Sequence, residues 1–242
     1  MRNAIKWVMP LLAVSLPMNA MGQKEPPPAP RQGNLVVNGG FEEWVDVKLV
    51  PDGILKREPV KHAVRIPADR WPRQWIPFWV VNQSGPAGSA DIARDETVAH
   101  SGKQSLRLTS RSSKDNICVE YTTELAIGSS QMPPAIRPNC HYILSWWVKG
   151  SSVAPGGGCR LDALYHLSQK GGKLQRVDVD ARDQDPPASG TFDWERHEFS
   201  FTTDADARSL SFNLGLRSTT GTIWLDDVEL KECGPAATVQ SY

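Results

Sequence analysis

The chain has 242 residues, and its 27 lysines and arginines balance its 27 aspartates and glutamates. Because these charges are interspersed and cancel, no basic patch is expected that would bind nucleic acid or an anionic lipid surface. No stretch beyond the N-terminal segment approaches a membrane span in length, so membrane insertion is also not expected.

The first 22 residues have the pattern of a cleavable secretory signal. Arg2 and Lys6 form the positive start, an apolar stretch runs from Trp7 to Leu16, and Ala20-Met21-Gly22 has the small residues of a cleavage site. The apolar stretch is too short to cross a bilayer. The sequence therefore predicts a secreted or periplasmic protein.

The rest of the chain reads as one domain with short flanking segments. Residues 23–32 contain four prolines, which cannot pair in a sheet and predict an extended, semi-rigid tether. Residues 33–234 have a length that suits one large all-β domain, and residues 235–242 form a tail.

Four cysteines follow the signal, at positions 118, 140, 159 and 233. An even number in an exported chain favours disulfides over free thiols, and the spacings match no zinc pattern. Three connectivities are possible. A pairing of Cys118 with Cys140 is weakly favoured, on the expectation that their strands are near neighbours.

Alternating apolar residues dominate the sequence, and helical periodicity is nearly absent. The alternating runs lie at 106–108, 117–121, 142–148, 161–167, 174–179, 199–201, 210–216 and 223–225. Clusters of Gly and Pro separate them, which is typical of a β-sandwich or jelly roll. Residues 45–70 are mixed in charge and are read as an insertion or a long loop.

Two segments near the ends of the domain carry adjacent carboxylates in apolar surroundings. Asn34 to Trp44 contains Glu42 beside Glu43, and Gly221 to Leu230 contains Asp226 beside Asp227. Buried carboxylates must be hydrogen-bonded, paired or bound to a cation. The two segments therefore predict a sheet in which the first and last strands meet at an oxygen-lined metal site. The alternation slips at the aspartate pair, which predicts a β-bulge there.

Four motifs in order give the chain a family likeness. They are N-L-V-V-N-G-G-F-E from Asn34, H-S-G-K-Q-S-L-R-L from His100, Y-I-L-S-W-W-V-K-G from Tyr142 and G-T-I-W-L-D-D-V-E-L from Gly221. Together they resemble carbohydrate-binding modules of the cellulase-C type, in the galactose-binding-like superfamily. The resemblance implies an all-β jelly-roll sandwich of two antiparallel sheets.

The same resemblance implies a structural Ca²⁺ near the first and last strands. Its ligands would be Glu42 and one of Asp226 or Asp227, with carbonyl oxygens from around Gly40 and the turn at 100–103. Calcium takes six to eight oxygen ligands, so this donor type is suitable. The alternative is that the acids pair with Arg or Lys, or lie in solvent.

Sugar recognition needs flat aromatic faces for the apolar side of a pyranose and polar side chains for its hydroxyl groups. With Trp146 assigned to the core, alternation turns Trp147 outward, and the same reasoning turns Asp162, Asn213 and Arg217 outward. These four are predicted to share a concave surface, with Trp147 as the aromatic platform. An exposed ion pair is the simpler reading of Asp162.

A second group of aromatic candidates lies in the run from Trp71 to Trp79. Trp71 and Trp75 are the two proposed ligand contacts, whereas Trp79 reads as part of a buried strand. Pro72 and Pro77 argue for a loop and strand rather than a continuous helix.

No catalytic motif is present. The five histidines have no metal-binding spacing, and there is no nucleophile elbow, P-loop or dinucleotide fingerprint. The predicted function is therefore a secreted, non-catalytic module that binds a polysaccharide or oligosaccharide on an aromatic-lined face. The alternatives are a structural or protein-interaction domain of the cell envelope, with envelope or secreted proteins as partners, and a glycan-active enzyme with paired carboxylates.

Overall fold

The computed structural model describes residues 29–46, 74–123, 133–155, 159–170, 173–179 and 188–236. The regular elements in these ranges are all strands: β1 (Val45–Asp46), β2 (Gln74–Trp75), β3 (Trp79–Ser84), β4 (Ala90–Asp95), β5 (Ser105–Ser110), β6 (Asn116–Thr122), β7 (Cys140–Val153), β8 (Cys159–Lys170), β9 (Lys173–Asp178), β10 (Gly190–Thr202), β11 (Ala207–Arg217) and β12 (Gly221–Pro235). The described part of the chain contains no helix that could cross a membrane.

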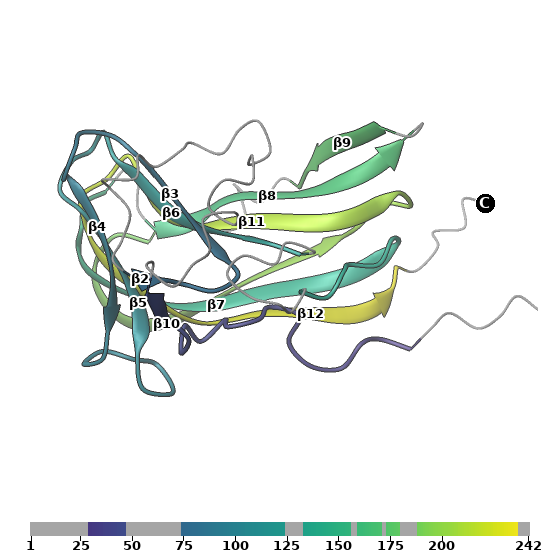
Figure 1. Cartoon of the computed structure of the whole chain (residues 1–242), viewed down its shortest axis with the longest axis horizontal. Coiled ribbons are helices and arrows are strands. Elements are labelled where there is room, and N and C mark those ends of the chain that lie inside the picture. Colours follow the sequence, from purple (N-terminus) through teal and green to yellow (C-terminus); the bar gives the residue numbers. More distant parts are fainter. Residues whose placement is uncertain are drawn as a thin grey trace, which may run out of the picture.

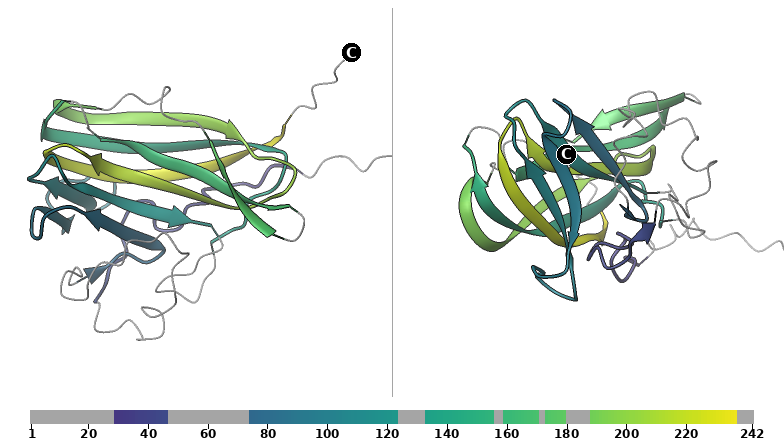
Figure 2. Two further views of the ribbon diagram at one scale, coloured as in Figure 1. Left: turned by 90° about the horizontal axis from the view of Figure 1, so that it is seen from above. Right: turned by 60° about the vertical axis from the view of Figure 1, so that its left-hand side comes forward.

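Two five-stranded sheets form the two layers of a sandwich (Figure 1). The β7 sheet has the order β10-β7-β12-β5-β4, and the β11 sheet has the order β3-β6-β11-β8-β9. All strand pairs in both sheets are antiparallel, and both sheets are twisted (Figure 2). The predicted all-β jelly-roll sandwich of two antiparallel sheets is confirmed.

Alternate side chains of each strand fill the space between the sheets. Tyr142, Leu144, Trp146 and Val148 of β7 are buried, and so are Val119 and Tyr121 of β6 and Phe212 and Leu214 of β11. Removing each such apolar side chain from water stabilises the folded state by roughly 1.5–3 kcal/mol. The predicted core positions of Trp146 and Trp79 are confirmed, with exposed fractions of 1% and 0%.

The N-terminal segment 34–44 lies along β12, as Figure 1 shows in purple, but it is a series of turns and not a regular strand. Leu35 N donates to Leu230 O at 2.9 Å, and Val228 N donates to Gly39 O at 2.9 Å. Asn38 and Phe41 have positive φ angles of 54° and 53°, which a strand does not tolerate. The first segment therefore meets the last strand as predicted. The prediction that this segment is itself a strand is wrong.

Residues 226–229 of β12 carry the bulge that the alternation predicted. The register with β7 shifts between Asp226↔Trp147 and Glu229↔Ser145, and Asp227 has a φ of 46°. The extra residue turns Asp227 toward the segment at 34–44 while Val228 stays in the core.

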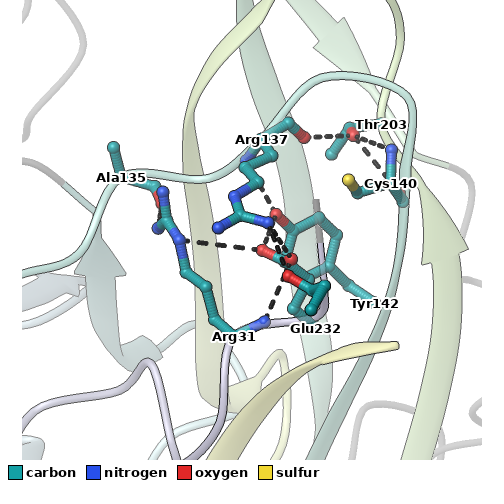
Figure 3. Close-up of polar contacts among 8 residues, drawn as sticks. Arg31, Ala135, Arg137, Cys140, Tyr142, Thr203 and Glu232 are labelled. Carbon is teal, nitrogen blue, oxygen red and sulfur yellow. Dashed lines mark hydrogen bonds and ion pairs between the residues drawn. The ribbon is translucent and has the colours of Figure 1, made fainter. Parts of the chain in front are cut away.

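A buried carboxylate fastens the beginning of the described chain to the end of the sandwich. Glu232 of β12 is 6% exposed, and Arg137 Nη1 lies 3.1 Å from its Oε1. Arg31 donates its backbone N–H to the same oxygen at 3.2 Å, and the Tyr142 hydroxyl donates to Oε2 at 3.2 Å. Figure 3 shows the Glu232 carboxylate between the two guanidinium groups and the Tyr142 ring.

The favoured pairing of Cys118 with Cys140 is wrong. Cys118 lies on β6 and Cys140 on β7, which belong to different sheets, and no disulfide joins them. Burial raises the pKa of the Cys140 thiol, and the Glu232 charge adds to this effect. Cys233 is an exposed thiol on β12, and the side chain of Cys159 lies outside the described residues.

Candidate functional site

The structure places the three residues predicted to bind a metal around Gly40. A methyl group built on Gly40 would lie 3.8 Å from Asp226 Oδ1, 3.7 Å from Asp227 Oδ1 and 3.8 Å from Glu42 Cγ. Gly40 thus lies at the centre of an acidic seam, which we define as Glu42, Asp226 and Asp227. The seam forms where segment 34–44 meets the bulge of β12.

Backbone N–H groups of the turn at 100–104 hold the acidic seam in place. Asp226 Oδ2 accepts hydrogen bonds from His100 N at 2.8 Å and Ser101 N at 3.2 Å. Glu42 Oε1 accepts one from Lys103 N at 2.8 Å. Gly102 has a φ of 64°, and a β-carbon there would lie 2.0 Å from Glu42 Oε1. Only glycine therefore allows this turn to close on Glu42 without displacing it.

Asp226 is fully buried, and none of the described Lys or Arg side chains forms an ion pair with it. Burial, against the N–H donors of His100 and Ser101 and with the charge of Asp227 beside it, raises the pKa of Asp226 to about 6. Asp227 Oδ2 lies 2.7 Å from His100 Nδ1. Such a concentration of carboxylates favours a bound cation.

The oxygen donors of the seam suit Ca²⁺ in chemical type. Within the described residues, however, no three His, Cys, Asp or Glu side chains meet the geometry of a metal cluster. A cation here would therefore need backbone carbonyl oxygens in addition to the carboxylates, as calcium sites commonly use.

Trp147 lies on the outer face of the β7 sheet, directly beside the acidic seam. Its ring stacks on His100 with a centroid distance of 3.8 Å and an interplanar angle of 16°. The Trp194 ring approaches His100 edge-on at 5.6 Å. A depression of about 270 Å³ adjoins the Trp147 ring and is lined by Asn34, Gly40, Ser145, Trp147, Arg196, Asp227, Val228 and Glu229. We call it the Trp147 depression.

The prediction that Trp147 shares a surface with Asp162, Asn213 and Arg217 is wrong. Trp147 belongs to the β7 sheet, whereas the other three belong to β8 and β11 of the β11 sheet. The outer faces of two packed sheets point in opposite directions, so the predicted set is divided. Asn213 and Arg217 do both turn outward on β11. The side chain of Asp162 lies outside the described residues, as do Trp71 and the side chain of Trp75.

Asn213 belongs to a row of polar side chains across the outer face of the β11 sheet. Its neighbours Phe212 and Leu214 are buried, so Asn213 points away from the core. By the same alternation Glu120 lies between buried Val119 and Tyr121. We define the polar face as Asn82, Glu120, Tyr165, Ser211 and Asn213.

Glu120 holds the centre of the polar face. Asn82 Nδ2 donates to its Oε2 at 2.8 Å, and the Tyr165 hydroxyl donates to its Oε1 at 3.1 Å. Burial raises the pKa of Tyr165, and the Glu120 charge adds to this although a hydrogen bond with Ser211 opposes it. The Arg176 guanidinium lies 3.9 Å above the Tyr165 ring. These contacts fix the rotamers of the polar face before any ligand arrives.

Three amide oxygens on this outer face have no hydrogen-bond donor in the described part of the protein. They are Asn82 Oδ1, Asn116 Oδ1 and Asn213 Oδ1, and each is buried in the surface. An acceptor removed from water without a partner costs roughly 1–3 kcal/mol. A row of such acceptors favours a ligand that carries hydroxyl or amide donors.

The sequence reasoning missed Tyr165 because the alternation of β8 contains an extra residue. The register with β11 shifts between Asn213↔Ala163 and Leu214↔Leu161, which leaves Asp162 unpaired in the ladder. Leu161, Leu164 and His166 are consequently buried, whereas Tyr165 is half-buried and turned outward. His166 has the same parity as Asp162, which was predicted to face outward, but it is buried. Glu120, between two apolar neighbours in β6, is the member that simple alternation could have found.

No family model and no curated protein matches the chain. Solved structures similar to it include the enzymatically active domain of bacteriophage CBA120 tailspike protein 4, at 13% identity and a TM-score of 0.44, which covers 64% of this chain and 19% of that one. The CBM22-1 xylan-binding domain of Paenibacillus barcinonensis Xyn10C is 16% identical with a TM-score of 0.41, and 65% of this chain and 87% of that chain are covered. TmCBM61, solved with β-1,4-galactotriose, is 16% identical with a TM-score of 0.37, over 82% and 98% of the two chains. The chain is thus similar, at low identity, to carbohydrate-binding modules, the group that its four motifs resemble.

Proposed function

We propose that this protein is a secreted, non-catalytic carbohydrate-binding module whose polar face binds a neutral oligosaccharide or polysaccharide. The observation that carries the proposal is the row of unpartnered amide oxygens around Glu120 and Tyr165 on one outer sheet face. Sugar hydroxyl groups are donors as well as acceptors, so a chain of pyranose rings could satisfy several of these oxygens at once.

The arrangement of the polar face also suits a ligand that extends across several strands. Asn82, Glu120, Asn213 and Tyr165 come from β3, β6, β11 and β8, which are consecutive in the sheet. Neighbouring strands are about 4.8 Å apart. A linear oligosaccharide lying across the strands would therefore meet a polar side chain at each step, with the Tyr165 ring as the apolar contact.

We further propose that the acidic seam binds a structural Ca²⁺. The fully buried Asp226 without a described cationic side chain, and the all-oxygen donor set of Glu42, Asp226 and Asp227, support this assignment. A bound cation would offset the cost of burying these charges and would lock segment 34–44 against β12. This Ca²⁺ would stabilise the fold at the β7 sheet, whereas the polar face lies on the β11 sheet.

Affinity electrophoresis and isothermal titration calorimetry against xylan, cello-oligosaccharides and β-1,4-galactotriose would test the polar face. Asn213→Ala and Tyr165→Ala should each weaken binding at least tenfold, because each removes a contact of roughly 1.4 kcal/mol. Ser200→Ala, at an exposed position of β10 in the other sheet, is the matched control. Equal binding by all three variants, or no binding of any glycan in a broad panel, would contradict the proposal.

The two alternative functions have separate readouts. Release of reducing ends from the same glycans would indicate an enzyme. Absence of binding to any glycan, together with a defined protein complex, would indicate an interaction domain. Intact mass of the protein recovered from the native host tests secretion, since signal cleavage predicts a mature chain that begins at Gln23.

A further inference from the structure

The Trp147 depression lies on the opposite sheet from the polar face, and the proposed function makes no use of it. Its lining combines one aromatic ring with polar groups from β7, β10, β12 and the N-terminal segment. Such a combination of a flat apolar surface and a few polar groups is the composition of a small-molecule site.

The aromatic wall of the depression is held rigidly. His100 stacks on Trp147 at 3.8 Å, and its Nδ1 lies 2.7 Å from Asp227 Oδ2. Because the stacked imidazole is itself tied to a carboxylate, rotation of the indole would lose its stacking on a fixed ring. A ligand would therefore meet a preorganised aromatic ring, which lowers the entropy cost of binding.

The polar groups of the depression suit the hydroxyl groups of a sugar. Asp227, Glu229 and Arg196 line it, so it offers both acceptors and donors. Ion pairs already offset part of these charges, because Lys231 Nζ lies 2.7 Å from Glu229 Oε2 and Arg196 Nη1 donates to Glu198 at 2.6 Å.

The size of the depression limits the length of its ligand. Its volume of about 270 Å³ lies just below the 300–1,000 Å³ typical of sites for drug-sized molecules. Such a volume holds one or two sugar rings.

We propose that the Trp147 depression is a second carbohydrate site, which takes one or two sugar rings of a glycan. It extends the proposed function to a second face of the molecule and shares with it only the class of ligand. No residue of the polar face lines it. With two sites on opposite sheets, one molecule could bridge two glycan chains.

Nuclear magnetic resonance titration of the ¹⁵N-labelled protein with xylobiose, cellobiose and β-1,4-galactobiose tests the second site. The indole N–H signal of Trp147, assigned with Trp147→Phe, should shift on addition of at least one disaccharide. Arg196→Ala removes an exposed wall residue and should weaken that response at least fivefold, whereas Ser200→Ala should not change it.

The same titration on the polar-face variant Asn213→Ala separates the two proposals. A Trp147 response that persists in this variant supports an independent site, even if the polar face itself proves inactive. No Trp147 shift with any of the three disaccharides, or a shift that Arg196→Ala leaves unchanged, overturns the second site. Loss of the Trp147 response in Asn213→Ala also overturns it, because the shift would then report binding at the polar face.

Discussion

At the scale of single residues, buried carboxylates explain how the two ends of the described chain are joined to the sandwich. Glu232 is compensated by Arg31, Arg137 and Tyr142, whereas the described residues give Asp226 only N–H donors, and its pKa is raised. Both lie on β12. Glu232 points inward by the alternation that follows the bulge, whereas Asp226 lies opposite Trp147 and is covered by the turn at 100–104 and by segment 34–44. A carboxylate that has paired guanidinium groups stabilises the fold, while one without them calls for another cation.

Replacement of Glu232 by Gln should destabilise the protein by about 1–3 kcal/mol. Breaking a buried ion pair leaves its partners uncompensated, although Arg31 and Arg137 are 31% and 27% exposed, so water recovers part of the cost. Urea unfolding monitored by tryptophan fluorescence measures the change. Glu96→Gln, which removes an exposed ion pair with Arg94, is the control and should change stability by less than about 0.5 kcal/mol. Equal effects of the two variants would show that the Glu232 cluster contributes no more than a surface pair.

Gly102 and Gly88 offer a matched test of the crowding at Glu42. Both have positive φ, at 64° and 73°, but a β-carbon at Gly88 would meet no atom within 4 Å. Ala at position 88 should therefore cost about 1–2 kcal/mol of backbone strain alone. Ala at position 102 should cost more, because Glu42 must also move, and Glu42→Ala should recover the difference. Thermal unfolding of the variants gives the comparison, and equal costs at the two glycines would contradict the crowding.

At the scale of elements, two register shifts decide how far the sequence could predict the sites. The shift in β12 leaves a visible mark, because Ile223 and Leu225 share one parity and Val228 and Leu230 the other. The shift in β8 leaves no such mark, since Leu, Ala, Tyr and Leu continue to alternate through it. Position 162 could therefore be placed on a strand but not on a face. Alternation also cannot show which sheet a strand belongs to, because strand order follows from long-range pairing. For this reason the prediction wrongly placed Trp147 and Asn213 on one surface.

The contact between segment 35–37 and β6 should make the protein sensitive to alkali. The Tyr121 hydroxyl accepts a hydrogen bond from Val37 N at 3.0 Å and donates to Leu35 O at 3.1 Å, and burial raises its pKa to about 12. The unfolded chain loses this proton near pH 10. The contribution of Tyr121 to the free energy of unfolding is therefore fully present below pH 10 and is lost as pH rises through 12.

Urea unfolding between pH 9 and 11.5 measures this loss. One extra proton held by the folded state changes stability by about 1.4 kcal/mol per pH unit. Tyr121→Phe should be less stable at pH 8 but should lose stability with pH more gradually than the parent protein. Identical slopes for the two proteins would show that Tyr121 ionises as easily in the folded state as in the unfolded one.

At the scale of the whole molecule, the sandwich separates its structural chemistry from the polar face. The acidic seam and the Glu232 cluster both lie on β12 and the segments beside it, while the polar face lies on the opposite sheet. Substitutions on the polar face should therefore change glycan binding there without changing the melting temperature. Substitutions of Glu42 or Asp226 in the seam should lower the melting temperature without changing binding at the polar face.

Removal of calcium is the sharpest test of this separation. A ligand bound only to the native state stabilises it by about 2.7 kcal/mol at a hundredfold excess over its dissociation constant. For a domain of this size that corresponds to a melting temperature lowered by roughly 5–10 °C in chelator, with recovery on addition of calcium. Asp226→Asn removes a carboxylate from the seam and should make the melting temperature insensitive to chelator, whereas Asp193→Asn, at an exposed position of β10, should leave the sensitivity intact. An unchanged melting curve in chelator, together with metal analysis that finds no calcium in the untreated protein, would mean that the N–H donors of the turn at 100–104 stabilise the seam without a cation.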